Sequence, residues 1–252
     1  MNFNKKFFFA ASALMAASTP ALAQVESASA SAAFKGIASP SLQVPTAFGA
    51  SWGGVGFGVY GQTCDCNNDD ADGSFGVAVG LGDADKYVGL EVAAASSSLF
   101  GDKGSGDSFG EVGAFGLKLH TNLPGNASFA VGVTGTGRWG DNNPNRSSVY
   151  AAAAKFFDLG PVASIVNIGI GDGIFNEPGD TGANVFGSAS LYFTPQIALI
   201  AEHTGRFTNA GVSFAPFKAF PLTLTVGGTN LGERYGADAE VAVAVGYGIN
   251  FK

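Results

Sequence analysis

The chain has 252 residues, of which 46% are hydrophobic and 13% are charged, and it contains 38 glycines. Charged residues are about half as frequent as the ~25% typical of soluble domains, and glycine is about twice as frequent as its usual ~7%. This composition argues against an ordinary soluble enzyme and, because aromatic residues and valine are plentiful, against disorder. The formal net charge of −7 argues against nucleic acid as a partner, because phosphate binding needs basic patches.

Residues 1–23 have the pattern of a secretory signal peptide. Lys5 and Lys6 form a basic start, Phe7–Ala17 is an apolar run, and Ala21–Ala23 provides small residues for cleavage. The apolar run is shorter than the ~18 residues that a membrane-spanning helix needs. We therefore expect export, with a buried N-terminal helix as the alternative.

The next segment, residues 24–47, is rich in serine and alanine and contains Pro40 and Pro45. It shows no periodicity typical of a strand. Two interpretations remain open, a flexible periplasmic lead-in and a plug that folds into the domain that follows.

Residues 48–252 form the third predicted unit, in which apolar and small residues alternate with a period of two. Such alternation is typical of strands that present two different faces. Near the C-terminus, for example, Val241, Val243 and Val245 alternate with Ala242 and Ala244. The predicted strands are Ser51–Tyr60, Ser74–Leu81, Tyr87–Ala95, Phe109–His120, Ala127–Arg138, Ser148–Phe157, Val162–Ile170, Asn184–Thr194, Gln196–His203, Asn209–Ala215, Leu222–Thr229 and Ala239–Phe251.

The connections between these segments favour a membrane barrel over a soluble β-sandwich. Connections after even-numbered segments are short, and most of those after odd-numbered segments are longer and more polar. Outer-membrane barrels have this asymmetry, and they carry aromatic residues at both ends of their strands, as these segments do. We predict an all-β fold, a transmembrane antiparallel up-and-down β-barrel of about 12 strands.

The signal peptide, the alternating strands and the stretch Val241–Phe251 resemble bacterial outer-membrane β-barrel proteins. This resemblance implies outer-membrane lipid as the surroundings and recognition of the C-terminal strand by the barrel-assembly machinery. Phe251 is penultimate here, whereas an aromatic residue usually ends such chains. Within Gln196–Gly232, the stretches Ala201–Arg206, Asn209–Val212 and Pro221–Leu224 are similar to the barrel repeats of YjbH-type exopolysaccharide porins, which implies passage of polysaccharide.

The predicted function is a channel for passive diffusion of small solutes or ions, biased by charges on the inward face of the strands. The lumen-facing positions are mostly small, which either leaves a narrow passage or permits tight curvature of the wall. A closed structural or adhesive barrel, acting through its long loops, is the alternative. The pore-lining candidates, chosen by their inward parity, are Glu91, Lys118, Arg138, Asn167, Glu202 and Glu240.

The sequence offers little for catalysis or metal binding, and we expect no cofactor. Asn68, Asp70 and Asp72 match the opening of a calcium loop, but Val79 stands where that loop needs a glutamate. A lipid-acting enzyme, the second alternative, needs a nucleophile paired with His120 or His203, and no serine is evident beside either. The two cysteines, Cys64 and Cys66, could bridge or remain thiols.

Overall fold

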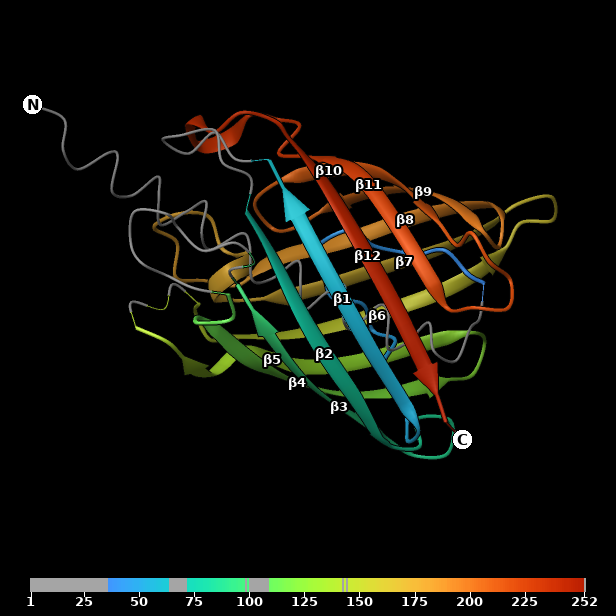
Figure 1. Ribbon diagram of the computed structural model, residues 1–252. Helices are drawn as coiled ribbons and strands as arrows, with labels where there is room; N and C mark the ends of the chain where they lie inside the picture. The colour runs from blue at the N-terminus through green and yellow to red at the C-terminus, as the bar shows by residue number, and fades with distance from the viewer. Residues whose placement is uncertain are drawn as a thin grey trace, which may run out of the picture.

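A computed structural model describes residues 36–63, 72–97, 99, 109–141, 143 and 145–251. These residues form a single closed barrel of antiparallel strands, each paired with its neighbours in sequence order (Figure 1). The predicted all-β up-and-down barrel with twelve strands is therefore confirmed. The strands are β1 (Gly54–Gln62), β2 (Asp72–Gly82), β3 (Gly89–Ser96), β4 (Gly113–Leu123), β5 (Ala127–Trp139), β6 (Ser148–Asp158), β7 (Ala163–Gly171), β8 (Asn184–Thr194), β9 (Ile197–His203), β10 (Thr208–Phe214), β11 (Leu222–Thr229) and β12 (Glu240–Asn250).

Each predicted segment overlaps one strand, and the largest difference is at β4. This strand starts at Gly113 rather than Phe109 and continues to Leu123. Phe109 and Gly110 form a turn, in which Gly110 has a φ of 77° that other residues rarely adopt. The ring of Phe109 stacks on Phe75 with 4.5 Å between centroids. This apolar contact explains why an aromatic residue stands outside the strand.

The barrel closes where β1 pairs with β12, in a register that runs from Gly54↔Asn250 to Gln62↔Ala242. Closure gives every strand two neighbours, so the ladder leaves no open edge. Among the described strand pairings, shifts of the register occur between β4 and β5 and between β8 and β9, in each case near a strand end. The strands are steeply tilted against the barrel axis, as Figure 1 shows.

The two faces of the wall differ in the way that the alternation predicts. On β12, Val241 and Val243 face outward with 55% and 41% of their surface exposed, whereas Ala242 and Ala244 are buried on the inside. The other strands repeat this pattern, with valine, leucine, isoleucine and phenylalanine outside and alanine, glycine, serine and threonine inside. The outer surface is consequently an apolar band, and the lumen wall has mostly small side chains, interrupted by a few large ones such as Tyr60, Tyr150 and Phe186.

Helical structure is limited to two short 3₁₀ turns, η1 (Gly173–Phe175) and η2 (Arg234–Gly236), in the part of the chain described. Among the described residues there is no helix with the length and apolar character needed to cross a membrane.

Short connections gather at one end of the barrel and include 83–88, 124–126, 159–162, 195–196 and 215–221. The opposite end carries the longer connections 172–183 and 230–239, among others. We call these the short-turn end and the long-loop end.

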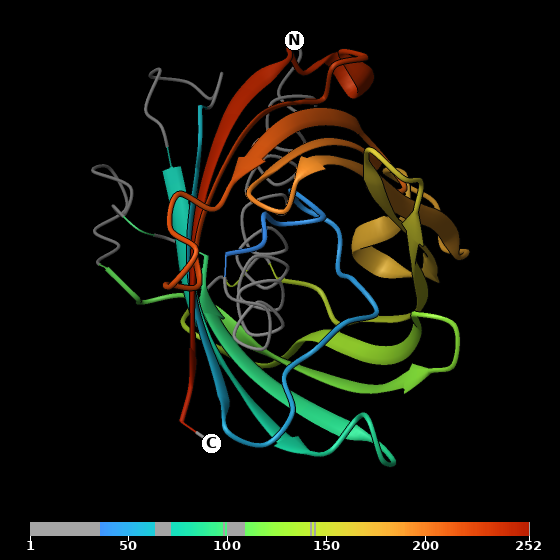
Figure 2. The ribbon, with the colours of Figure 1, turned by 90° about the vertical axis from the view of Figure 1, so that its right-hand side faces the viewer.

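Residues 36–50 are not part of the wall and lie within the barrel, as the blue trace in Figure 2 shows. We call them the luminal segment. Near its start, the Ala38 amide donates to the Pro195 carbonyl at the short-turn end, 2.8 Å away. Its middle, at Gln43, contacts residues where β1 ends and β10 begins, at the long-loop end. The segment then returns, and Ala50 contacts Glu91 near the start of β3. The luminal segment is therefore a re-entrant loop with both ends at the short-turn end.

Candidate functional site: the contact between the luminal segment and the wall

The carboxylate of Glu202, on β9, is the centre of the contact near the long-loop end. It accepts hydrogen bonds from the backbone amides of Leu42 and Gln43, each at 2.9 Å, and from the Ser41 hydroxyl at 3.0 Å. The side-chain amide of Asn209, on β10, donates a fourth bond at 2.9 Å. Hydrogen bonds to a charged acceptor contribute about 1.5–3 kcal/mol each, so this carboxylate is a principal anchor of the segment.

The side chain of Gln43 is held in a polar socket beside Glu202. Its amide nitrogen donates to the Tyr60 hydroxyl at 2.6 Å, and its oxygen accepts from Asn209 at 2.8 Å. Tyr60 donates to Gln62, whose amide in turn donates to Glu240 on β12. The socket therefore joins strands β1, β10 and β12 through one residue of the luminal segment.

Apolar packing adds to these bonds in the residues that follow Gln43. Val44 and Ala47 are buried against the aromatic side chains of Tyr150, Phe175 and Phe186. The rings of Phe175 and Phe186 stack with 4.3 Å between centroids, and Tyr150 meets both edge-on. Because η1 folds Phe175 into the lumen from the 172–183 loop, this part of the long-loop end is filled by side chains.

Residues 45–50, the limb of the luminal segment that returns to the short-turn end, are held first by Asn167 on β7. The Asn167 side chain accepts from the Ala47 amide at 3.1 Å and donates to the Pro45 carbonyl at 3.0 Å. One backbone amide and one backbone carbonyl of this irregular stretch thereby find a partner in a single side chain, as buried backbone polar groups require.

Ala50, the last residue of the luminal segment, forms hydrogen bonds with the wall through both its amide and its carbonyl. Its amide donates to Glu91 at 2.8 Å, and its carbonyl accepts from Nε2 of His120, on β4, at 2.9 Å. Glu91 also forms an ion pair with Lys118 at 3.0 Å, in which each side chain is 1% exposed. A β-carbon added at Gly80 would lie 2.3 Å from the Ser51 carbonyl oxygen, so the wall leaves room here only for glycine.

The first limb has its own contacts with the wall. The Ser39 amide donates to the Ser213 hydroxyl at 2.8 Å, and the Tyr192 hydroxyl donates to the Ala38 carbonyl at 3.0 Å. Both wall residues lie on strands at the short-turn side of Glu202. The start of the luminal segment is therefore attached to β8 and β10, and its end at Ala50 is attached to β3 and β4.

The structure brings four of the predicted pore-lining residues to the luminal segment or its anchors. Glu91, Asn167 and Glu202 bind its backbone directly, and Lys118 pairs with Glu91. Glu240 lies one residue further out, at Gln62. Arg138 lies apart from them on an exposed part of β5, where its guanidinium donates to the Asn145 carbonyl at 2.7 Å.

Sequence reasoning missed the roles of Asn209, Tyr60 and Ser213 in this contact. All three have inward parity on their strands, which is the signal that could have found them. Polar uncharged residues on an inward face are common, however, so parity without a partner segment did not single them out.

The other candidates lie elsewhere. Asn68, Asp70, Cys64 and Cys66 fall outside the described residues, and Asp72 begins β2. No cluster of His, Cys, Asp and Glu suited to a metal ion occurs in the described part of the chain. His203 points outward at the end of β9, with Nδ1 3.4 Å from the Thr208 hydroxyl, and His120 binds Ala50.

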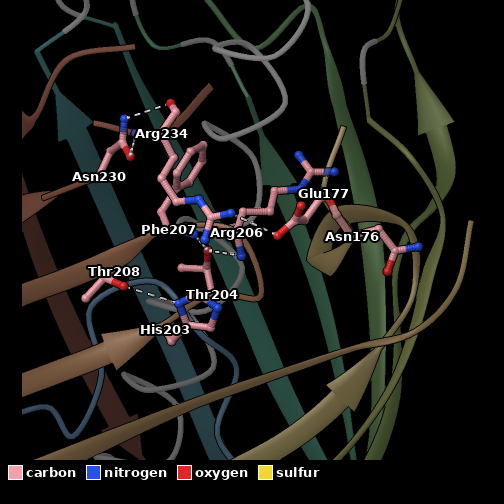
Figure 3. A network of polar contacts seen from close by, with 9 residues as sticks. All are labelled: Asn176, Glu177, His203, Thr204, Arg206, Phe207, Thr208, Asn230 and Arg234. Carbon is pink, nitrogen blue, oxygen red and sulfur yellow. Dashed lines mark hydrogen bonds and ion pairs between the residues drawn. The ribbon is translucent and has the colours of Figure 1, made fainter. Parts of the chain in front are cut away.

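The long-loop end carries a second polar network, which ties three connections together (Figure 3). Arg206, between β9 and β10, donates to the carbonyls of Asn176 and Gly173 in the 172–183 loop. Burial lowers the pKa of Arg206, and the nearby charge of Arg146 lowers it further. Arg234, on η2, pairs with Glu177 at 3.2 Å.

Asn230 organises the third connection of this network. Its side chain accepts from the Arg234 amide at 2.9 Å and donates to the Ala237 carbonyl at 2.8 Å. Asn230 has a φ of 49° and Tyr235 a φ of 61°, in the left-handed region that costs non-glycine residues energy. These bonds compensate the cost and fix the conformation of the 230–239 loop itself.

No protein-family model and no curated protein sequence matches the chain. The local resemblance to exopolysaccharide porins therefore stays a prediction. Solved structures do match, among them the crystal structure of Neisserial surface protein A (NspA). That alignment has 12% sequence identity and a TM-score of 0.22, and it covers 79% of this chain and 96% of NspA. A TM-score of this size is too low for the likeness to bear on function.

Proposed function

We propose that this protein is an outer-membrane β-barrel of the channel class, closed by its own luminal segment and opened to small solutes when that segment leaves. Solutes would move by diffusion, without chemistry. Export by residues 1–23 and insertion through the C-terminal strand by the assembly machinery belong to the same proposal.

The apolar outer band supports a membrane location. Large exposed side chains, such as Ile168 at 59%, Val185 at 56% and Val149 at 58%, occur on strand after strand around the wall. Soluble monomers rarely expose contiguous apolar patches larger than ~300–600 Å². A closed ladder also meets the requirement that every backbone polar group in hydrocarbon has an internal partner.

The observation that carries the channel proposal is how the lumen is filled. A barrel that serves only as a scaffold can fill its interior with side chains from the wall itself. Here most inward wall residues are small, apart from a few aromatic side chains such as Tyr60, Tyr150 and Phe186, and a separate piece of backbone, residues 36–50, lies buried against them. Its anchors include Glu202, Asn167 and Asn209, polar groups that water could solvate once the segment had moved.

A permanently closed surface barrel is the second candidate. The network of Arg206, Asn230 and Arg234 favours it, because it holds three connections of the long-loop end in one arrangement. Such a surface could contact a partner without any passage through the lumen.

A reversible lock distinguishes the two candidates. Ser39→Cys and Ser213→Cys, in a background with Cys64→Ser and Cys66→Ser, place a disulfide where the Ser39 amide now meets the Ser213 hydroxyl. In planar bilayers we expect single-channel steps under reducing conditions and their loss on oxidation. The cysteine-free background is the control, and its conductance should not respond to oxidant. Steps that persist in the oxidised double variant would refute gating by the segment, and absence of steps in every sample would refute the channel itself.

A further inference from the structure

We infer that the lumen selects cations over anions once the luminal segment has left, and that Glu202 sets this selectivity. The inference rests on the proposed function and names the class of solute that passes.

Few fixed charges face the lumen. Among the described strand residues, the buried side chains with a fixed charge are Glu91, Lys118 and Glu202. Glu91 and Lys118 lie 3.0 Å apart, so an ion in the lumen meets a dipole there rather than a net charge. The remaining buried charge on the described strands is that of Glu202.

The surroundings of Glu202 change more than those of the other two when the segment leaves. Within the described residues, no lysine or arginine forms an ion pair with it. Three of the four groups that donate to it, the Ser41 hydroxyl and the amides of Leu42 and Gln43, belong to the luminal segment. Departure of the segment would leave a carboxylate with Asn209 as its donor from the wall.

The position of Glu202 makes its charge effective. It lies on β9 one residue before the strand ends, at the level where the Gln43 side chain meets β1 and β10. Glu240, which binds Gln62 at the same level of the wall, adds a second carboxylate. The nearest buried cation along the chain is Arg206, but its guanidinium is bound to the carbonyls of Asn176 and Gly173 in the 172–183 loop.

Reversal potentials test the inference on the full mature chain in planar bilayers under a KCl gradient. A unit charge at 4 Å in water contributes about 1 kcal/mol, which is roughly 5-fold in an equilibrium. Glu202→Gln keeps the size of the side chain. Because the lost charge attracts potassium and repels chloride, each by roughly this factor, the potassium-to-chloride permeability ratio should fall by roughly 25-fold.

Ser41→Ala is the matched control. It removes one hydrogen bond to the same carboxylate and leaves the charge of the lumen unchanged. We expect more frequent opening with a reversal potential equal to that of the unmodified chain.

The outcomes separate the two proposals. If Ser41→Ala channels conduct but show no preference for potassium, the inference is overturned and the channel stands, even where Glu202→Gln fails to fold. Equal reversal potentials in the two variants would overturn it as well. Absence of conductance in the unmodified chain and in Ser41→Ala would overturn the proposed function and the inference together.

Discussion

Ile168 provides a direct test of what surrounds the barrel. It faces outward from β7, 59% exposed, and pairs with Ala153 of β6 and Gly187 of β8. Ala153 is the central residue of β6, so Ile168 lies near the middle of the apolar band. Leu231 is a matched control, since it is 50% exposed but belongs to the connection between β11 and β12 at the long-loop end.

The substitution Ile168→Arg has very different costs in the two possible environments. In water, a surface substitution of this kind changes the free energy of unfolding by at most about 0.5 kcal/mol. At the midplane of a bilayer, an arginine on the lipid face of a barrel costs ~2–4 kcal/mol, which falls to about 0–1 kcal/mol near the interfaces. We therefore expect the folding equilibrium in lipid to fall by about 30- to 1,000-fold for Ile168→Arg, at 1.36 kcal/mol per decade, and to change little for Leu231→Arg.

Denaturant titration of protein refolded into lipid vesicles measures this difference, with tryptophan fluorescence as the signal. Trp52 and Trp139, the two tryptophans of the chain, supply the fluorescence. Equal unfolding free energies for the two variants in vesicles would show that hydrocarbon does not cover the band. The membrane location, and with it the proposed channel, would then be refuted.

Two further predictions concern the wall beneath the luminal segment. Lys118→Met removes the cation 3.0 Å from the buried Glu91 carboxylate and should lower the free energy of unfolding by about 3–5 kcal/mol, and adding Glu91→Gln to the same chain should restore part of the loss. Denaturant titration in micelles measures both changes. A change within 0.5 kcal/mol for Lys118→Met would contradict the role of the pair. Gly80→Ala places a β-carbon 2.5 Å from the Ala50 carbonyl carbon and should displace the end of the luminal segment at Ala50. Channels should therefore open more often than in the control Gly61→Ala, where an added β-carbon meets nothing within 4 Å. Equal opening frequencies of the two variants in planar bilayers would count against this contact.

The strands were predictable because the two faces of each strand have different surroundings, the outside of the barrel for one face and its interior for the other. A period of two survives in β12, where Val243 and Val245 alternate with Ala242 and Ala244, whatever the neighbouring strands contain. Strand ends were less predictable, because pairing with a neighbour decides where a ladder stops. At β4 the pairing with β5 continues to Leu123↔Ala127, beyond the predicted end at His120.

The course of the luminal segment was not predictable in the same way. Residues 36–50 form neither strand nor helix, so no periodicity marks which side chains are buried. Their order comes from distant partners, such as Glu202 for Gln43 and Asn167 for Ala47. Inward parity placed Glu202 and Asn167 on the lumen wall, but only the folded chain shows that they bind its own backbone.

The attachment of one short segment to strands that lie far apart in the chain has a consequence for biogenesis. The contact of Ser39 with Ser213 joins residues 174 positions apart in the chain, and the barrel closes when Gly54 pairs with Asn250. Loop closure over such distances is slow, because entropy is lost before contacts compensate it. The segment can thus reach all of its partners only after β9 and β10 have formed, which makes occupation of the interior one of the last events of assembly.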